Sequence, residues 1–447
     1  MTKRLCIIGG GISGLTVAFL LRRAGADVVL LEAADRFGGN IGTERHNGFL
    51  LENGPNSLLR SPRLIDLIDA LGLRSRVLPS SPAAKNRFVL IDGELSPVPM
   101  GLRSFLGGDF FSRGAKLKIL REPFVHSKAA AGESVAEFFT RRLGNEVVAK
   151  AVDPFISGIY AGDVEKLSIE AAFPRFFAFE RDHGSLLWGA LRNKDERPEK
   201  EFPRSFTFIN GLNEMIDRLE AELAGSISLG TRVESIAIDN GKFRIAFGGS
   251  EEMFDHVVIS TRAGSAGEMV RSFDPHLAER LVKLEYPPVA VIRLGFHEEQ
   301  VGRRPDGFGF LVPRDAGLPI LGSLWNSSVF SGRAPARHHL LTSFVGGARR
   351  PELFDRPDDE LFGMVLDSLG KIMDISGEPV HQSIVRWPRA IPQYDTAQLE
   401  TSRHVRRFEQ ERPGIHFCSN FIGGISVGDC VKNAYAVADR IAASFNE

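Results

Sequence analysis

Residues 5–14 read Leu-Cys-Ile-Ile-Gly-Gly-Gly-Ile-Ser-Gly, and this stretch decides the class of fold. Its four apolar residues are typical of a short strand that is buried on both faces of a parallel sheet. The glycines match the pattern G-x-G-x-x-G, which binds the pyrophosphate of a dinucleotide where a strand turns into a helix. There Gly9 would permit the tight turn, Gly11 would leave room for the phosphates, and Gly14 would let the helix pack on the sheet.

The residues that follow support a dinucleotide site. Apolar residues recur at helical spacing over residues 15–24, and the run Val-Val-Leu-Leu at 28–31 predicts a second buried strand. Ile12 and Ser13 then lie in the first turn of the helix, whose free N–H groups and partial positive charge attract phosphate. Glu32 ends the second strand at about the spacing expected for a carboxylate that binds ribose hydroxyls, and it disfavours the 2′-phosphate of NADP.

Residues 32–39 read Glu-Ala-Ala-Asp-Arg-Phe-Gly-Gly. This segment resembles the E-x-x-x-R-x-G-G extension of the superfamily of FAD-dependent amine oxidases and desaturases. Arg36 can offer a bidentate pair of N–H groups to a phosphate, and Gly38 and Gly39 let the backbone approach a cofactor closely. The resemblance implies that the dinucleotide is FAD and that Ala33 and Arg36 contact it.

The last segment before the C-terminal helix carries the other half of the predicted flavin site. Residues 423–430 read Gly-Gly-Ile-Ser-Val-Gly-Asp-Cys, and we expect the helix to begin near Asp429 or Cys430. A helix N-terminus there would favour negative charge on a reduced flavin ring. The resemblance implies that Ile425 and Val427 contact FAD and that Asp429 holds its ribityl chain, while a plain N-cap role would also suit Asp429.

Within this superfamily the chain resembles the protoporphyrinogen oxidase family over nearly its whole length. The segments that carry the resemblance are Gly-Pro-Asn-Ser at 54–57, Pro-Phe-Ile-Ser-Gly-Ile-Tyr-Ala-Gly-Asp at 154–163, Gly-Phe-Gly-Phe-Leu-Val-Pro at 307–313, Ala-Ile-Pro-Gln-Tyr at 390–394 and Gly-Ile-Ser-Val-Gly-Asp-Cys at 424–430. The family oxidises protoporphyrinogen IX to protoporphyrin IX by removing six electrons, with FAD as hydride acceptor and dioxygen reduced to hydrogen peroxide. The resemblance therefore implies a porphyrinogen oxidase of haem biosynthesis, which requires no metal.

The same resemblance implies a substrate site. The family's anchoring arginine aligns with Arg87, whose guanidinium could pair with a propionate, although a surface arginine is the alternative. Gly158 aligns with a glycine at the edge of the macrocycle, and Asn56 aligns with a position near the flavin. The other walls implied are Phe308, Gly309, Leu311, Leu324 and Phe344, of which the two aromatic residues could stack on pyrrole rings. The further FAD contacts implied are Gly54, Pro55, Asn56, Val233 and Trp387.

Composition excludes several other classes of protein. A net charge of −1 gives no reason to expect nucleic-acid binding. Three widely spaced cysteines argue against a disulfide framework or a zinc site, and they favour a reducing compartment such as the cytoplasm. No stretch approaches the roughly 18 apolar residues of a membrane span. The apolar run at residues 5–8 is too short for a signal peptide.

We expect an α/β protein of three parts. These are a Rossmann-type FAD-binding domain (1–80, 205–270 and 405–447), a discontinuous substrate domain with a mixed β-sheet (81–95 and 271–404) and a helical domain (96–204). Polar residues 193–204 form the most obvious linker. The helical domain corresponds to the family's membrane-docking domain, and its apolar residues 98–106 with basic residues nearby suit an interfacial helix as well as a buried lid. Peripheral attachment to the inner membrane and a homodimer both stay open.

Periodicity also predicts particular elements. We expect a hairpin over 88–95, because Asp92-Gly93 is a typical two-residue turn, and a β-meander over 227–261. The other strands expected are 289–296, 309–312, 320–325, 340–345 and 415–419. The other helices expected are 62–73, 212–223, 357–373 and 431–445.

Other functions remain as alternatives. A coproporphyrinogen III oxidase that forms coproporphyrin III would share this architecture, and a second basic anchor in the pocket would favour that substrate, which has four propionates. An amine oxidase needs an aromatic cage beside the flavin, and four Tyr and three Trp leave little material for one. A desaturase-type flavoenzyme or a flavoprotein without turnover would also keep the dinucleotide motif.

Overall fold

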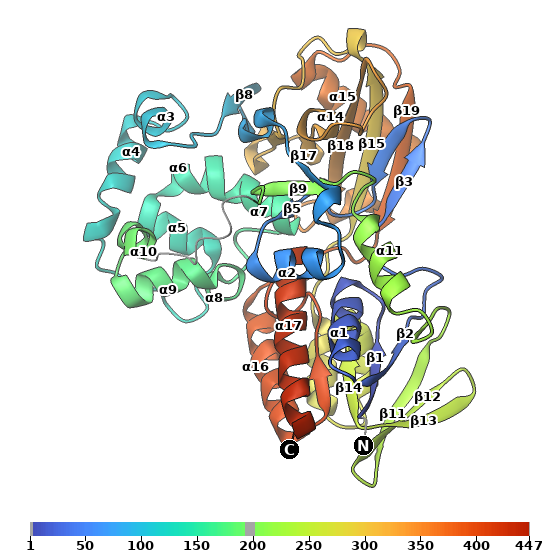
Figure 1. The fold of residues 1–447 in the computed structure, drawn as a ribbon. Helices are drawn as coiled ribbons and strands as arrows, with labels where there is room; N and C mark the ends of the chain where they lie inside the picture. The colour runs from blue at the N-terminus through green and yellow to red at the C-terminus, as the bar shows by residue number, and fades with distance from the viewer. Residues whose placement is uncertain (1–2, 193–201, 447) are drawn as a thin grey trace.

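A parallel sheet forms the centre of the part of the fold that begins at the N-terminus. In the computed structural model, which describes residues 3–192 and 202–446, five strands lie in the order β10-β2-β1-β14-β20, and every neighbouring pair is parallel (Figure 1). The strands are β1 (Arg4–Ile8), β2 (Asp27–Leu31), β10 (Ile227–Ser228), β14 (His256–Ile259) and β20 (Ile415–Phe417). The predicted Rossmann-type α/β class is therefore confirmed.

Helices cover both faces of this sheet because its strands are apolar on both faces. Leu5 and Ile7 point into one core, whereas Cys6 and Ile8 point into another, as expected for residues that alternate along a strand. The helices on the first face are α1 (Ile12–Arg23), α2 (Pro62–Ala70), α11 (Asn213–Glu222) and α17 (Val427–Ala443). The helices on the second face are α12 (Ala263–Val270), α13 (Pro275–Lys283) and α16 (Thr396–Glu411).

The meander expected over residues 227–261 is smaller than predicted. It consists of β11 (Val233–Asp239), β12 (Lys242–Phe247) and β13 (Ser250–Phe254), whereas β10 and β14 pair with the parallel sheet. The prediction was wrong for those two strands. The physical reason is visible in β14, where Val257, Val258 and Ile259 are all fully buried, as is typical of a strand covered on both faces.

A second sheet of seven strands, mixed in direction, lies above the first in Figure 1. Its order is β19-β15-β18-β17-β16-β7-β8, and only β16 and β7 pair in parallel. The predicted hairpin forms its edge. The strands are β7 (Phe88–Ile91), β8 (Glu94–Pro97), β15 (Val289–His297), β16 (Gly309–Leu311), β17 (Ile320–Leu324), β18 (His338–Gly346) and β19 (His381–Trp387). Helix α15 (Asp358–Met373) packs on one face.

A group of helices lies beside the two sheets (Figure 1). They are α3 (Leu102–Gly107), α4 (Arg113–Leu120), α5 (Val135–Leu143), α6 (Asn145–Val147), α7 (Asp153–Tyr160), α8 (Ile169–Ala172), α9 (Pro174–His183) and α10 (Leu186–Arg192). A π-helical turn, Val148–Val152, leads directly into α7. Within the described ranges, no helix is both long and apolar enough to cross a bilayer. Of the predicted linker, residues 193–201 lie outside the described residues.

Short elements complete the fold. They are β3 (Thr43–His46), β4 (Phe49–Glu52), β5 (Leu58–Leu59), β6 (Val77–Pro79), β9 (Ser205–Phe208) and α14 (Asn326–Val329). Helix α2 ends three residues before the predicted boundary, because Gly72 takes a φ of +70° that ends the helical turn.

The start of α17 also differs from the prediction. The helix begins at Val427, and its N-cap is Ser426. The Ser426 hydroxyl accepts a hydrogen bond from the Asp429 N–H (3.0 Å), and the Asp429 carboxylate accepts one from the same hydroxyl (2.6 Å). This is a capping box, so Asp429 is the third residue of the helix and not its N-cap.

Candidate functional site

A cavity of about 1740 Å³ has walls from both large sheets. Loops at the carboxyl edge of the parallel sheet form one end, which is where ligands bind in such sheets. The predicted residues that line the cavity are Gly9, Gly11, Ile12, Ser13, Glu32, Ala33, Arg36, Gly38, Gly39, Gly54, Pro55, Asn56, Arg87, Gly158, Val233, Phe308, Leu311, Leu324, Phe344, Trp387, Ile425 and Val427. Three predicted site residues, Gly14, Gly309 and Asp429, are not among its lining residues.

The three motif glycines have different roles in the turn. Gly9 has a φ of +110°, and a side chain there would also meet the Ser260 carbonyl oxygen at 2.8 Å. At Gly14 a Cβ would lie 2.0 Å from the Gly9 carbonyl oxygen, so this glycine lets α1 pack against the turn. At Gly11 a Cβ would meet nothing within 4 Å, because the position faces the cavity.

Two side chains order the loop after β2. The Glu32 carboxylate accepts hydrogen bonds from the Gly10 N–H (2.6 Å) and the Ala34 N–H (2.8 Å). The Arg36 guanidinium donates to three carbonyl groups of its own loop, those of Phe37, Gly39 and Ile41, at 2.6–3.1 Å. Among the described residues, no acceptor takes the Nε hydrogen or the second Nη2 hydrogen of Arg36, so these donors suit a phosphate, and the three bonds fix the orientation of the guanidinium.

The N-terminus of α17 closes the same end of the cavity. Ile425, Val427 and Gly428 line the wall, whereas the Asp429 side chain turns back to cap the helix. This arrangement requires a glycine at position 424, because a Cβ there, at a φ of +119°, would lie 2.5 Å from the Asp429 carboxyl carbon. The first residues of the helix thus line the cavity, and the Asp429 carboxylate is engaged by the Ser426 hydroxyl.

The loop before β5 lies between the two ends. The Trp387 indole donates to the Asn53 carbonyl (2.7 Å), which fixes the loop against β19. The Asn56 amide donates to the Gly54 carbonyl (3.0 Å) and accepts from the Asn326 side chain (2.7 Å). These contacts hold the Asn56 amide in one orientation on the cavity wall.

The seven-stranded sheet supplies an apolar wall. Val291 and Phe344 lie directly opposite each other on β15 and β18, and both line the cavity together with Leu324 of β17. Gly309 is needed for a different reason. Its φ is +133°, and a Cβ there would lie 2.1 Å from the Ser323 carbonyl oxygen, so it permits close pairing of β16 with β17.

Arg87 brings a positive charge to this apolar end. Its guanidinium carbon lies 4.7 Å from the ring centroid of Phe308, a cation–π contact. Burial lowers the pKa of Arg87, and the neighbouring charge of Arg204 lowers it further. Within residues 3–192 and 202–446, the Arg87 side chain has no carboxylate partner. An unpaired guanidinium against an aromatic ring is suited to a carboxylate ligand.

Helix α7 closes the cavity directly beside β16. Ser157 and Gly158 line the wall, and a Cβ at Gly158 would lie 2.5 Å from a methyl group of Leu311. The helix therefore touches β16 with no space to spare at this point. The wall is closely packed here, and it carries one buried hydroxyl, that of Ser157.

Known proteins match the chain over almost its full length. Residues 12–442 match the family described as flavin containing amine oxidoreductase. Protoporphyrinogen oxidase 2 of Arabidopsis thaliana, a chloroplast and mitochondrial protein, is 31% identical, with 98% of this chain and 94% of the relative covered. The chain belongs to the protoporphyrinogen oxidase family. It is an FAD-dependent oxidoreductase.

Two further relatives agree with this membership. Coproporphyrinogen III oxidase of Bacillus subtilis is 29% identical over 99% of both chains. The crystal structure of a candidate protoporphyrinogen oxidase from Exiguobacterium sp. superposes with a TM-score of 0.81 at 28% identity, over 99% of both chains. A UDP-galactopyranose mutase structure, at 17% identity and a TM-score of 0.73, shares the fold alone.

The cavity of this family member fits FAD on its own chemistry. Gly11 leaves open space where a pyrophosphate would approach the N-terminus of α1, and Glu32 presents a fixed carboxylate at the ribose position. The described lining residues include six arginines (Arg36, Arg87, Arg232, Arg262, Arg271 and Arg389) and three glutamates (Glu32, Glu234 and Glu268). That excess of positive charge suits a ligand with phosphate groups.

Some residues of the site were not predicted from the sequence. Tyr394 is buried, and its hydroxyl accepts from the Gly424 N–H (2.8 Å) and donates to the Asn420 carbonyl (2.9 Å). It therefore supports the segment that begins α17. Its place at the end of the family segment 390–394 was the available signal. Arg262 lines the cavity directly after β14, where a strand end at the ligand edge could have marked it.

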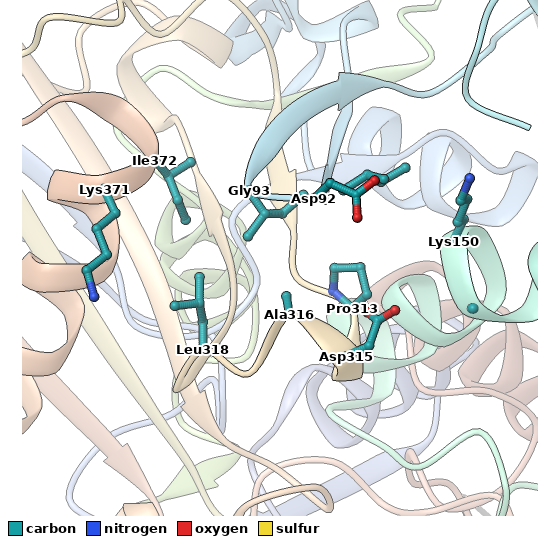
Figure 2. A pocket seen from close by; sticks show the side chains of 12 residues that line it. Asp92, Gly93, Lys150, Pro313, Asp315, Ala316, Leu318, Lys371 and Ile372 are labelled. Atoms are coloured by element: carbon teal, nitrogen blue, oxygen red, sulfur yellow. The ribbon is translucent and has the colours of Figure 1, made fainter.

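A second cavity, of about 430 Å³, is separate from this site (Figure 2). Figure 2 shows Lys150 and Lys371 on opposite sides of it. The Lys150 ammonium donates to the Glu146 carboxylate (2.9 Å) and the Phe110 carbonyl (3.2 Å), which use two of its three hydrogens. Among the described residues no group of three or more His, Cys, Asp or Glu side chains could hold a metal ion.

Proposed function

We propose that this protein oxidises protoporphyrinogen IX to protoporphyrin IX, with dioxygen as the electron acceptor and hydrogen peroxide as the second product. The observation that carries the proposal is the position of Arg87. It offers an uncompensated guanidinium at the apolar end of a cavity whose other end carries the dinucleotide motif. A macrocycle with apolar faces and carboxylate arms matches such a pocket. The names of the relatives support the same substrate class.

The protein's own residues bind and orient the substrate in this proposal. Arg87 anchors a propionate, Phe344 and Val291 cover the apolar face, and α7 excludes water from the other side. We assign Asn56 to orient the macrocycle, because its amide is held by Gly54 and Asn326. Bound FAD supplies the hydride acceptor and returns electrons to dioxygen.

A second candidate is the oxidation of coproporphyrinogen III to coproporphyrin III. The specific observation in its favour is the positive charge of Arg204, which adds to the larger effect of burial in lowering the pKa of Arg87. Ser205, the next residue, lines the cavity. A second positive charge near Arg87 suits a substrate with more carboxylate arms, and Arg204 is an exposed residue that does not itself line the cavity.

A side-by-side rate measurement tests both candidates. The purified flavoprotein is supplied with anaerobically prepared protoporphyrinogen or coproporphyrinogen, and porphyrin fluorescence, oxygen uptake and hydrogen peroxide are followed after air is admitted. Turnover of neither substrate would refute the proposal. Amine oxidation in place of porphyrinogen oxidation would favour an amine oxidase.

Arg87→Ala tests the anchor directly. Loss of one charge-assisted hydrogen-bonded pair, about 1.5–3 kcal/mol, should raise KM about 10- to 100-fold while the FAD content stays unchanged. Arg63→Ala is the matched control, because Arg63 is an arginine stacked on Tyr435 outside the cavity. Unaltered kinetics in Arg87→Ala would remove this residue from the site.

We also propose peripheral contact with a membrane through α3, α4 and the turn after them. Leu102, Leu106, Leu120 and Phe124 are all at least half exposed, and Phe124 is 75% exposed. Basic residues such as Arg103 lie among them, a combination typical of interfacial binding. Sedimentation with anionic vesicles tests this, and replacement of Leu102 and Phe124 by serine should abolish it. A cytoplasmic location and a homodimer remain predictions, the latter open to light scattering.

A further inference from the structure

Helix α7 is held at both ends by consecutive residues of the loop that follows β18. At the C-terminal end of the helix, the Ala348 N–H donates to the Ala161 carbonyl (2.7 Å). At the other end, Nη2 of Arg349 donates to the Asp153 carbonyl (2.7 Å). The loop is tight, since a Cβ at Gly347 would lie 2.6 Å from the Ala161 carbonyl oxygen. Movement of α7 therefore requires movement of this loop.

Arg349 also binds the seven-stranded sheet. Its Nη1 donates to the carbonyl of Val312 (3.1 Å), the residue directly after β16. Its Nη2 forms an ion pair with Oδ1 of Asp153 at 2.6 Å, while its hydrogen bond goes to the Asp153 carbonyl. Both side chains are buried, at 8% and 7% exposure. One guanidinium thus joins the first residue of α7 to the end of β16.

Helix α7 and strand β16 are also in direct contact in the wall of the cavity. Gly158 of α7 contacts Leu311 of β16 so closely that a single added carbon would clash, at 2.5 Å. Leu311 is the neighbour of Val312, to which Arg349 is bonded. A change in the Arg349 contacts would therefore move the wall residues Gly158 and Leu311, although neither Arg349 nor Asp153 lines the cavity.

The Asp153 carboxylate has a second partner that keeps it in place. The Arg314 N–H donates to Oδ2 of Asp153 (3.1 Å), and the half-exposed Arg314 side chain pairs with Asp163, just beyond the end of α7. With Arg349 removed, the nearest cation that the described residues offer to the buried Asp153 would be the half-exposed Arg314, whose Nε lies 3.9 Å from Oδ1. A buried carboxylate without its cation tends to move toward water or take up a proton.

We propose that Arg349 is a positioning residue that sets the width of the substrate end of the cavity by clamping α7 to β16 through Asp153 and Val312. The choice of porphyrinogen as probe rests on the proposed function, whereas the clamp itself does not. A buried ion pair that served stability alone would leave the affinity for substrate unchanged. The two roles therefore differ in what they do to KM.

Arg349→Met, which keeps the length of the side chain and removes its charge and donors, is the direct test. We expect KM for the porphyrinogen to rise about tenfold, in line with the sensitivity of pre-organised sites to small displacements. The ratio of FAD to protein and the aerobic reoxidation rate of dithionite-reduced flavin should stay unchanged. Arg349→Lys should restore part of the loss, because one ammonium can reach Asp153 or Val312 but cannot bridge both as the guanidinium does.

Control variants separate the clamp from general damage. Arg337→Met removes an exposed arginine that pairs with Glu298 and Glu299, and it should leave KM as in the wild type. If Arg349→Met does not fold, Arg349→Met/Asp153→Asn removes the buried charge as well and carries the same expectation. A folded variant with unchanged KM would overturn the proposal, even if its melting temperature fell.

A readout without turnover keeps the clamp testable if the protein oxidises no porphyrinogen. In Arg349→Met, the amides of Gly158 and Ile159 should exchange hydrogen at least tenfold faster, because local opening of α7 becomes easier. Exchange in α15 should stay as in the wild type. Unchanged exchange in α7 would overturn the clamp. If the wild type turns over no porphyrinogen, but Arg349→Met still exchanges faster in α7 than the wild type does, the proposed function is refuted and the clamp stands.

Discussion

Gly11→Val should abolish FAD binding while the apoprotein stays folded. The backbone of Gly11 has φ −73° and ψ 176°, which any residue can adopt, and a Cβ there meets nothing within 4 Å. The substitution should therefore change the free energy of unfolding of the apoprotein by only about 0.5 kcal/mol. The added methyl groups would, however, project into the cavity at the N-terminus of α1, where the pyrophosphate is expected to bind.

The expected loss of affinity follows from the bonds that are blocked. If two charge-assisted hydrogen bonds from the helix N-terminus are lost, at about 1.5–3 kcal/mol each, the total is about 3–6 kcal/mol. That corresponds to an increase in Kd of about 10²- to 10⁴-fold. Titration of apoprotein with FAD, followed by quenching of flavin fluorescence, measures Kd, and urea unfolding of both apoproteins measures stability.

Gly14→Ala is the matched comparison within the same motif. Its Cβ would lie 2.0 Å from the Gly9 carbonyl oxygen, a backbone atom that cannot yield without moving the turn. We expect the apoprotein itself to lose about 3 kcal/mol or more. A Gly11→Val protein that binds FAD with a Kd within threefold of the wild type would refute the reasoning. So would a Gly14→Ala apoprotein as stable as the wild type.

Three further outcomes are expected. Tyr394→Phe should lower the temperature of flavin release and cost about 2 kcal/mol, because the Gly424 N–H and Asn420 carbonyl lose their partner; unchanged release would contradict this. Arg204→Ala should raise KM for coproporphyrinogen more than for protoporphyrinogen, and equal effects would remove it from substrate choice. Burial raises the pKa of Glu52 from 4.5 to about 7, so the folded state binds this proton more tightly than the unfolded state does. The contribution of Glu52 to the free energy of unfolding is therefore fully present below pH 4.5 and is lost as the pH rises to about 7. The loss is about 3 kcal/mol, and Glu52→Gln should remove that slope between urea midpoints at pH 5 and pH 8 relative to the wild type.

Much of the fold follows from local sequence patterns. The order strand, glycine turn, helix and strand over residues 5–31, and the hairpin at Asp92-Gly93, appear where the sequence predicts them. These features depend on contacts within a few residues, such as the left-handed turn at Gly9. Which strands pair with one another was harder to predict from the sequence. A short apolar run such as β14 reads equally well as part of a meander or of a parallel sheet until its neighbours are known.

The residues of the candidate site also fall into those that could be predicted from the sequence and those that could not. Most of the site residues that the motif and the family resemblance imply do line the cavity, because each was taken from a segment whose place in the family fold is known. Asp429 behaves differently, since its carboxylate is engaged by Ser426 and turned from the cavity wall. Tyr394 and the Arg349 clamp were missed, because each acts through a partner that the sequence does not name.

The resemblance of residues 32–39 to a known superfamily indicated FAD. By itself, the sequence determined the dinucleotide turn and the acidic residue that follows it. Those features depend on backbone torsion, side-chain size and spacing within one βαβ unit. The tertiary structure alone decided that Arg87 stands unpaired against Phe308 and that Arg349 joins Asp153 to Val312, residues 196 and 37 positions away along the chain. The reason is physical. Such contacts form only when distant segments are brought together by burial of the apolar cores, and no local pattern records which polar groups will then face each other.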